Sequence, residues 1–255
     1  MQNCIFVCIF NNENYIRMFF LLLESIISYG NIGDDTHILI YTSTIFSNFI
    51  KQNENYKKNN DKIFFEINDT YNNIDTACKS RLDLFDLKSI EKYNKILYLD
   101  IDIIIKDDIH KVFNAVKHDI IYALEEGEID AENGYWWGKT LFGDEIHHYP
   151  NKTAFTSGIL LFNNCDKIKE LFKRIHETMV TKPNAPGGDQ PYIVYNAFKY
   201  RLYDNQTLKK HVVNNDYNFR GDKVIYHFAG GVGEYGHKLV KMNAFLNGLK
   251  SFYPK

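Results

Sequence analysis

Two aspartates one residue apart give the clearest chemical signal in the sequence. Asp100 and Asp102 end the segment Lys95–Asp102 (KILYLDID), whose apolar run predicts a buried strand. Because alternate residues of an extended segment point the same way, both carboxylates would face one cleft beyond the carboxyl end of a sheet. Paired carboxylates suit Mg²⁺ or Mn²⁺, which removes their mutual repulsion and can also bridge a diphosphate. The motif therefore predicts a divalent metal site, although Asp-x-Asp arises easily by chance and a solvated strand end is the structural alternative.

A phosphatase of the haloacid-dehalogenase type is a second interpretation of the same two residues. In such enzymes an aspartate is the nucleophile that accepts the phosphoryl group, and the motif follows the first strand, usually with Gly-Thr or a similar pair after it. Here the motif stands at residue 100, after several expected strands, and Ile103 and Ile104 follow it. The phosphatase interpretation is therefore the weaker of the two.

The elements that must hold these residues alternate between strand and helix patterns. Apolar runs predict strands at residues 4–10, 37–41, 62–67, 95–102, 119–124, 155–163 and 224–228. Helical spacing predicts helices at residues 15–29, 45–52, 76–90, 166–180, 190–198 and 239–249, with a polar loop at 53–61 and an irregular stretch at 125–151. This alternation predicts an α/β fold with a mostly parallel central sheet. Because no internal repeat or linker is evident, residues 1–255 are expected to form a single domain.

Charge and cysteine content narrow the expected partners and location. The 30 basic residues balance 32 acidic ones, and the net charge of −2 argues against a nucleic-acid partner. We expect neither a transmembrane segment nor a secretory leader, because the apolar runs are short and lack a basic flank. The four cysteines (Cys4, Cys8, Cys78 and Cys165) lack zinc-site spacing and are expected to be buried and reduced. These features predict a soluble, cytoplasmic protein.

Further sequence motifs occur along most of the chain, before and after the two aspartates. The order and spacing of five blocks resemble glycosyltransferase family 8, which includes glycogenin and the bacterial lipopolysaccharide galactosyltransferases. The blocks are FNNENY (10–15), RLDLFDL (81–87) with KILYLDID (95–102), TSGILLFN (156–163), GGDQ (187–190) and HFAG (227–230). The resemblance implies a Rossmann-like GT-A fold with flanking helices. It also implies Mn²⁺-dependent transfer, with retention of configuration, of a hexose (glucose or galactose) from a UDP-sugar to a glycan, glycolipid or protein acceptor.

The resemblance assigns a metal set and a catalytic set. The metal would be held by Asp100, Asp102 and His227. An imidazole nitrogen is a good ligand for Mn²⁺, with Mg²⁺ also possible, when two carboxylates supply charge. The residues nearest the chemistry would be Arg81 at the diphosphate and sugar, Asp189 at the sugar hydroxyls and Gln190 near the anomeric carbon. The metal and the arginine would stabilise the charge that develops on the leaving UDP.

The donor nucleotide is expected at the loop after the first strand and at the strand ends beside it. An aromatic ring such as Tyr15 is suited to stack on uracil, and Asn12 to read the edge of the base. The remaining donor contacts that the resemblance implies are Ile9, Asn11, Arg81, Asp100, Ile101, Asp102, Ser157 and Gly230.

Several of these residues also have an ordinary structural interpretation. His227 could be a satisfied core histidine. Asn12 and Asp189 could be helix N-caps. Arg81 could be an exposed helical arginine paired with an aspartate two or five residues further on. The sequence alone leaves these alternatives open.

The last block departs from the family pattern His-x-x-Gly-x-x-Lys, whose lysine grips the diphosphate. Gly233 stands where that lysine is expected, and the next lysine is Lys238. We expect Lys238, ahead of His237, to take the role, because a glycine-rich loop can fold back. Gly230, Gly231 and Gly233 could also offer backbone N–H groups to phosphate.

The acceptor side of the protein carries little sequence information. Tyr135, Trp136 and Trp137 fall in an expected loop, where aromatic faces could stack on an acceptor sugar or plug the fold. A non-catalytic relic that binds nucleotide-sugars or glycans is the alternative from another class of protein. Such a relic would be expected to lose a metal ligand, yet all three are present. The sequence leaves a homodimer possible.

Overall fold

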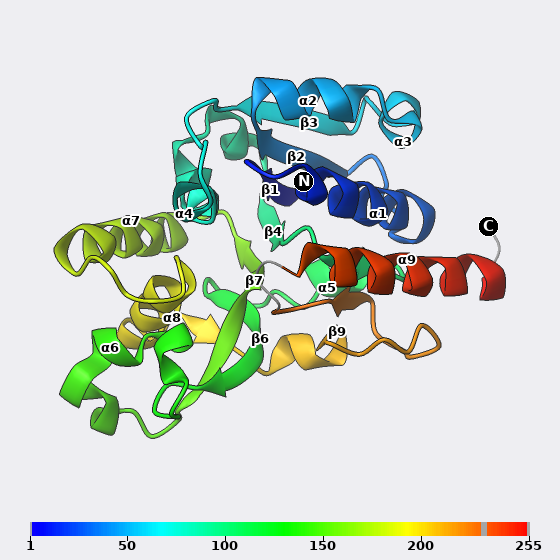
Figure 1. Ribbon diagram of the computed structural model, residues 1–255. Coiled ribbons are helices and arrows are strands. Elements are labelled where there is room, and N and C mark those ends of the chain that lie inside the picture. Colours follow the sequence, from blue (N-terminus) through cyan, green and yellow to red (C-terminus); the bar gives the residue numbers. More distant parts are fainter. Residues whose placement is uncertain (1, 231–233, 254–255) are drawn as a thin grey trace.

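A seven-stranded sheet forms the centre of the computed structural model, which describes residues 2–230 and 234–253 (Figure 1). The strand order is β3-β2-β1-β4-β7-β6-β8. The strands are β1 (Asn3–Ile9), β2 (Thr36–Thr42), β3 (Ile63–Ile67), β4 (Lys95–Leu99), β6 (Ile121–Glu128), β7 (Thr153–Asn163) and β8 (Tyr203–Asp204). From β3 to β4 all neighbours are parallel, as are β6 and β8, whereas β7 is antiparallel to both β4 and β6. The expected α/β fold with a mostly parallel sheet is confirmed.

A second sheet of three strands has the order β5-β10-β9. It comprises β5 (Ile103–Ile105), β9 (Val212–Asn214) and β10 (Ile225–His227). In β10, His227 lies opposite Ile103 of the antiparallel β5 and opposite Asn214 of the parallel β9. Because β5 directly follows Asp102 in the chain, this small sheet brings the end of β10 to the Asp-x-Asp motif.

Helices cover both faces of the central sheet (Figure 1). The α-helices are α1 (Glu13–Tyr29), α2 (Thr44–Lys51), α3 (Glu54–Lys58), α4 (Ile74–Ala77), α5 (His110–Phe113), α6 (Lys139–Phe142), α7 (Asp166–Thr181), α8 (Gln190–Lys199) and α9 (Tyr235–Phe252). The 3₁₀ helices are η1 (Ser80–Asp86), η2 (Lys88–Lys92), η3 (Gly134–Trp137), η4 (Gly143–His148) and η5 (Thr207–Lys210).

Alternation along β1 explains the two layers of the core. Ile5 and Val7 belong to an apolar cluster that includes the buried faces of α1 and α9, which pack against each other. Cys4 and Phe6 point to the opposite face and join a cluster with α7 and α8. Since both faces of the strand are buried, its sequence is apolar throughout, as expected for a central parallel strand. No helix of the described residues is long and apolar enough to cross a membrane.

Several local expectations are wrong, among them the irregular stretch at 125–151, which contains the end of β6 and all of α6. Residues 76–90 do not form one helix but end α4 and continue as η1 and η2, with Leu87 in an extended conformation between them. The reason is tertiary: Leu82 and Leu84 both enter the core while the side chain of Arg81 lies buried among carboxylates, a pattern that one α-helical face cannot provide. The expected loop at 53–61 contains α3, which Asn53 caps through its side chain.

Candidate active site

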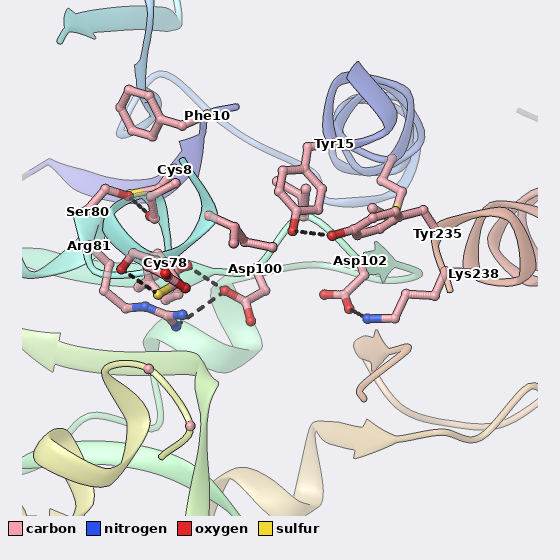
Figure 2. A pocket seen from close by; sticks show the side chains of 18 of the residues that line it. Cys8, Phe10, Tyr15, Cys78, Ser80, Arg81, Asp100, Asp102, Tyr235 and Lys238 are labelled. Carbon is pink, nitrogen blue, oxygen red and sulfur yellow. Dashed lines mark hydrogen bonds and ion pairs between the residues drawn. The ribbon is translucent and has the colours of Figure 1, made fainter. Parts of the chain in front are cut away.

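A cavity of about 480 Å³ lies beyond the ends of β1 and β4, between η1 and the start of α9 (Figure 2). The volume falls in the range of small-molecule sites. Six residues expected at the donor site line the cavity, namely Tyr15, Arg81, Asp100, Ile101, Asp102 and Lys238. Among the described residues, the lining also includes Cys8, Phe10, Cys78, Ser80, Trp136 and Tyr235, which the sequence did not single out for the donor.

Asp100 and Asp102 line this cavity, and His227 lies beside them without lining it. Their potential ligand atoms all lie within 4.8 Å of one another. β4 ends at Leu99, so both aspartates lie in the loop before β5 rather than in the strand as expected. The backbone N–H of Phe228 donates to the carbonyl of Asp102 at 2.9 Å, and Nε2 of His227 lies 3.4 Å from Oδ1 of Asp102. The small sheet, rather than strand alternation, therefore assembles the three residues.

Gly158 lets the backbone of β7 approach the side chains of His227 and Asp100 closely. A Cβ atom at this position would lie 2.6 Å from Cε1 of His227 and 2.8 Å from Oδ2 of Asp100. Any other residue would therefore push the imidazole and the carboxylate apart. Two carboxylates and an imidazole whose potential ligand atoms lie this close together suit a divalent cation of the Mg²⁺ or Mn²⁺ type.

The imidazole of His227 is oriented by two residues that sequence reasoning missed. Its Nδ1 lies 2.9 Å from Oδ1 of Asn214, and Nδ2 of Asn214 donates to Oε1 of Glu126 at 3.0 Å. This arrangement assigns the Nδ1 hydrogen to the bond with Asn214 and leaves Nε2 facing Asp102. His227 is buried, as a core histidine would be, but its free nitrogen points at the carboxylates. Asn214 reaches it only through the β9–β10 register, which no local pattern encodes.

Lys238 from α9 forms an ion pair with Oδ2 of Asp102 (Figure 2). Burial alone would raise the pKa of Asp102, but His227 and Lys238 outweigh it and hold the pKa well below its usual range. Burial would lower the pKa of His227, yet the neighbouring carboxylates raise it. Gly230 has a left-handed backbone with φ +78°, whereas Gly231 and Gly233 lie outside the described residues. Lys238 thus reaches the cavity despite the altered spacing of the last motif.

Arg81 links Asp100 to Asp189. Its Nη1 lies 3.3 Å from Oδ1 of Asp100 and donates to the Ser157 carbonyl at 2.6 Å, and its Nε forms a 2.7 Å ion pair with Oδ2 of Asp189. The arginine is largely buried, so the exposed helical alternative is wrong. Burial lowers the pKa of Arg81 but its two carboxylate partners raise it further, so it stays a cation.

Asp189 and Gln190 extend this network toward the irregular segment. Burial raises the pKa of Asp189 to about 6, although Arg81 opposes the shift. Asp189 is the N-cap residue of α8, as the alternative predicts, but its side chain makes no capping hydrogen bond. Oε1 of Gln190 accepts from the backbone N–H (2.9 Å) and hydroxyl (3.2 Å) of Ser157, and its Nε2 donates to the Trp136 carbonyl at 3.2 Å. Trp136 is 40% exposed, whereas Trp137 is buried.

Only some of the residues expected around the base lie at the cavity. Tyr15 lines the cavity, and its hydroxyl lies 3.1 Å from that of Tyr235. Asn12 caps α1 by accepting from the N–H of Asn14, which confirms the capping interpretation. Asn11 is exposed, with φ +70°. Ile9 does not line the cavity, because alternation along β1 turns its side chain into the α1 layer and leaves Cys8 and Phe10 facing the cavity.

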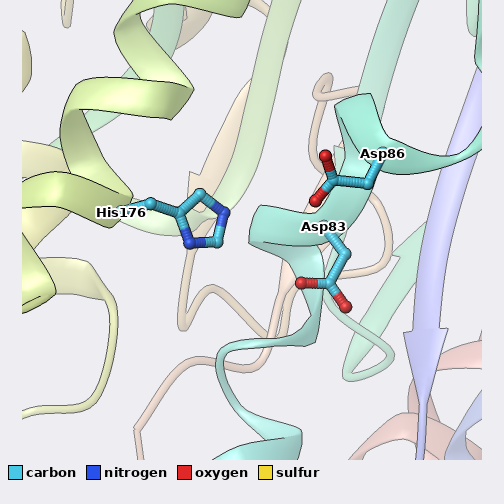
Figure 3. Close-up of side chains that lie close together, drawn as sticks. All are labelled: Asp83, Asp86 and His176. Atoms are coloured by element: carbon cyan, nitrogen blue, oxygen red, sulfur yellow. The ribbon is translucent and has the colours of Figure 1, made fainter.

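A second carboxylate–histidine set, Asp83, Asp86 and His176, also has potential ligand atoms within 4.8 Å of one another (Figure 3). Asp83 accepts hydrogen bonds from the hydroxyls of Tyr41 (2.9 Å) and Tyr71, and Nε2 of His176 lies 3.0 Å from the Leu82 carbonyl. These bonds tie η1 to β2 and α7. They therefore help to position Arg81, which η1 carries.

The fold, the cavity beyond the strand ends and the convergence of charged residues define the class of protein as a GT-A glycosyltransferase. The sequence matches the model of Glycosyl transferase family 8 over residues 4–226, and the chain belongs to this family. No curated protein matches the sequence. Family membership makes the phosphatase interpretation wrong, because in this family the Asp-x-Asp belongs to a transferase.

Solved glycosyltransferase structures share this fold. Galactosyltransferase LgtC, in complex with donor and acceptor sugar analogs, superposes with a TM-score of 0.68 at 15% identity, covering 94% of this chain and 95% of that one. Mouse xyloside xylosyltransferase 1 in its apo form gives 0.60 at 13% identity, over 89% of this chain and 97% of that one. Apo-form GlyE of Streptococcus pneumoniae TIGR4 gives 0.60 at 14% identity, over 98% of this chain and 64% of that one. Identities this low establish the fold and leave the substrates open.

Proposed function

We propose that this chain transfers a hexose from a UDP-sugar to a glycan, glycolipid or protein acceptor, with retention of configuration and with a divalent cation, Mn²⁺ by preference. The observation that carries the proposal is the convergence of Asp100, Asp102 and His227 at the cavity that Arg81 and Lys238 also enter. The donor type and retention follow from resemblance to the family. The geometry supports a polyanionic ligand, since two cationic side chains reach one cavity.

Asp100, Asp102 and His227 are the residues that would hold the cation, since the donor set and the proximity of its atoms both fit it. A divalent cation bound there would supply positive charge to the diphosphate as the leaving group forms. The side chains of the protein make contributions that are distinct from the charge of the cation. Asn214 holds the imidazole with one nitrogen free for the site, and the cations of this chain compensate charge that would otherwise be buried unpaired.

The remaining residues have separable roles in this proposal. Arg81, held by Asp189 and Ser157, presents a fixed guanidinium to the diphosphate or sugar. In its ionised form Asp189 accepts hydrogen bonds from sugar hydroxyls, and Gln190, fixed by Ser157 and by Trp136, lies near the anomeric carbon. Such preorganised groups lower the barrier because they need no reorientation during the reaction. Lys238 contacts the diphosphate once the donor is bound.

The test is calorimetric titration of UDP with and without Mn²⁺ on the wild type and on Asp102→Ala. We expect Mn²⁺-dependent binding that weakens by ~100-fold or more in the variant, since one ligand and its charge are lost. UDP-glucose and UDP-galactose are then compared for hydrolysis and transfer, and the anomeric proton of the product is assigned by NMR. Absence of UDP binding with any metal would reject the donor assignment. Binding without turnover of either sugar nucleotide would favour the non-catalytic relic.

A further inference from the structure

The first turn of α9 places a cation on one of the proposed metal ligands. Lys238 pairs with Asp102, and both side chains are largely buried, at 17% and 10% exposure. In the described part of the chain, the Lys238 ammonium contacts Asp102 alone. A second anchor is Tyr235, whose ring meets that of Tyr15 edge-on at 5.2 Å between centroids and whose hydroxyl contacts the Tyr15 hydroxyl (Figure 2). This contact fixes the turn of α9 beside the cavity.

The two cations at the carboxylates differ in how firmly they are held. Arg81 is fixed by three partners, Asp100, Asp189 and the Ser157 carbonyl. Lys238 is carried on a flexible four-carbon chain with one partner, so it can leave with little loss of structure. A divalent cation at Asp102 would face the like charge of this ammonium at contact distance, and like charges so close repel strongly where water is scarce.

Resting on the function proposed above, we infer that Lys238 holds Asp102, one of the proposed metal ligands, in the absence of donor and thereby makes metal and donor bind together. With no diphosphate present, the ammonium neutralises Asp102 and competes with the metal. When a diphosphate arrives, the ammonium has a second anionic partner and releases Asp102. Since coupling between two ligands is reciprocal, UDP then increases the affinity for Mn²⁺ and Mn²⁺ increases the affinity for UDP.

The inference predicts opposite signs for two affinities of one variant. In Lys238→Met, Mn²⁺ binding without nucleotide should tighten about tenfold, because the competing charge is gone, a factor that corresponds to ~1.4 kcal/mol. UDP binding at saturating Mn²⁺ should weaken by about the same factor, because the diphosphate loses a cation. Free Mn²⁺ is measured by its EPR signal, and UDP binding by calorimetry.

Two further variants serve as controls. Lys238→Arg keeps the charge and should leave Mn²⁺ affinity close to that of the wild type. Lys241→Met removes a lysine from the next turn of α9, where Lys241 is exposed and its Nζ lies 3.2 Å from the Tyr217 hydroxyl. It should change neither affinity, whereas a general disturbance of α9 would affect both lysine-to-methionine variants alike.

The outcomes separate this inference from the proposed function. A wild type that binds Mn²⁺ and UDP, with a Lys238→Met variant whose Mn²⁺ affinity is unchanged or weaker, would overturn the inference and leave the proposed function standing. A wild type that binds neither Mn²⁺ nor UDP would overturn both. Tighter Mn²⁺ binding in Lys238→Met together with weaker UDP binding supports both.

Discussion

Two clusters in this molecule have the same composition but different surroundings. Asp100, Asp102 and His227 meet at the cavity, whereas Asp83, Asp86 and His176 meet where η1 approaches α7 (Figure 3). In both clusters the potential ligand atoms lie within 4.8 Å of one another. Distance between ligand atoms therefore does not distinguish them.

The difference lies in what already satisfies each group. At the second cluster, neutral protein groups bond to Asp83 and His176, namely two tyrosine hydroxyls and a backbone carbonyl. At the first cluster, the carboxylates meet the charged side chains Arg81 and Lys238, and Gly158 packs so closely against the cluster that a larger residue would displace it. A set of potential ligand residues can become a binding site when a flexible cation that a ligand can displace, here Lys238, holds its charge.

The glycine that packs against the first cluster is the most direct target for mutation. In Gly158→Ala, the new Cβ would meet the imidazole of His227 at 2.6 Å and the carboxylate of Asp100 at 2.8 Å. We expect Mn²⁺ affinity to fall by about 100-fold, at the upper end of what misoriented ligands cost. The measurement is Mn²⁺ binding in the presence of UDP, with circular dichroism to check folding. A folded variant with wild-type affinity would contradict the view that His227 and Asp100 hold the metal in these positions.

The charge network at the first cluster should make kcat/KM fall on the acid side of its pH profile. The pKa of Asp189 is raised by burial to about 6, so the carboxyl is neutral below that pH and ionised above it. Because the ionised form is the one that holds Arg81 and accepts from sugar hydroxyls, kcat/KM should fall by about tenfold per pH unit below pH 6. This acid limb should be absent in Asp189→Asn, which should also have a lower plateau.

The control for this pH profile is the Mn²⁺ concentration. Protonation of His227 would also lower activity in acid, but extra Mn²⁺ would counteract that effect because metal and proton compete for the same nitrogen. A limb that moves with Mn²⁺ concentration would assign it to His227 instead of Asp189. A limb near pH 6 that stays fixed supports Asp189.

The support behind His227 provides a smaller test. In Asn214→Leu the imidazole loses its partner at Nδ1, so the ring is free to rotate or to change tautomer. We expect Mn²⁺ affinity to fall by about tenfold, as is typical when a partner of a metal-bound histidine is removed. Asn214→Asp keeps an acceptor for the Nδ1 hydrogen and should recover part of the loss. Equal loss in both variants would point to packing rather than to orientation of the ring.

The strands and the Asp-x-Asp motif were predictable because their signals are local. The strand at β1 and the helices α1 and α7 follow from runs and periodicities within a few turns, and the motif stands at the end of such a run. Family resemblance added His227 and Arg81, whose own sequence neighbourhoods fit ordinary structural roles equally well. It could not correct the single helix expected at 76–90, because the burial of Arg81 depends on carboxylates that follow it at distant positions.

The residues that support the site could not be predicted from the sequence, because their contacts also join distant positions of the chain. Asn214 contacts His227 through strand register, and Glu126 enters only through Asn214. Tyr235 meets Tyr15 across 220 positions of the chain. Each is an unremarkable polar or aromatic residue in its own segment, so only the packing of distant elements gives it a place in the site.

The second cluster supplies the smallest expected effect and the sharpest contrast. Asp83→Asn should leave Mn²⁺ and UDP affinities unchanged, because we place no metal there, but should destabilise the fold by ~1–2 kcal/mol as its bonds to Tyr41 and Tyr71 are weakened. Asp86→Asn is the matched variant: Asp86 is exposed, so its stability should change by no more than ~0.5 kcal/mol. Urea unfolding and Mn²⁺ EPR measure the two quantities. If Asp83→Asn and Asp86→Asn both removed a bound Mn²⁺, the second cluster would be a metal site. Hydrogen bonds from neutral groups would then not explain the difference between the two clusters.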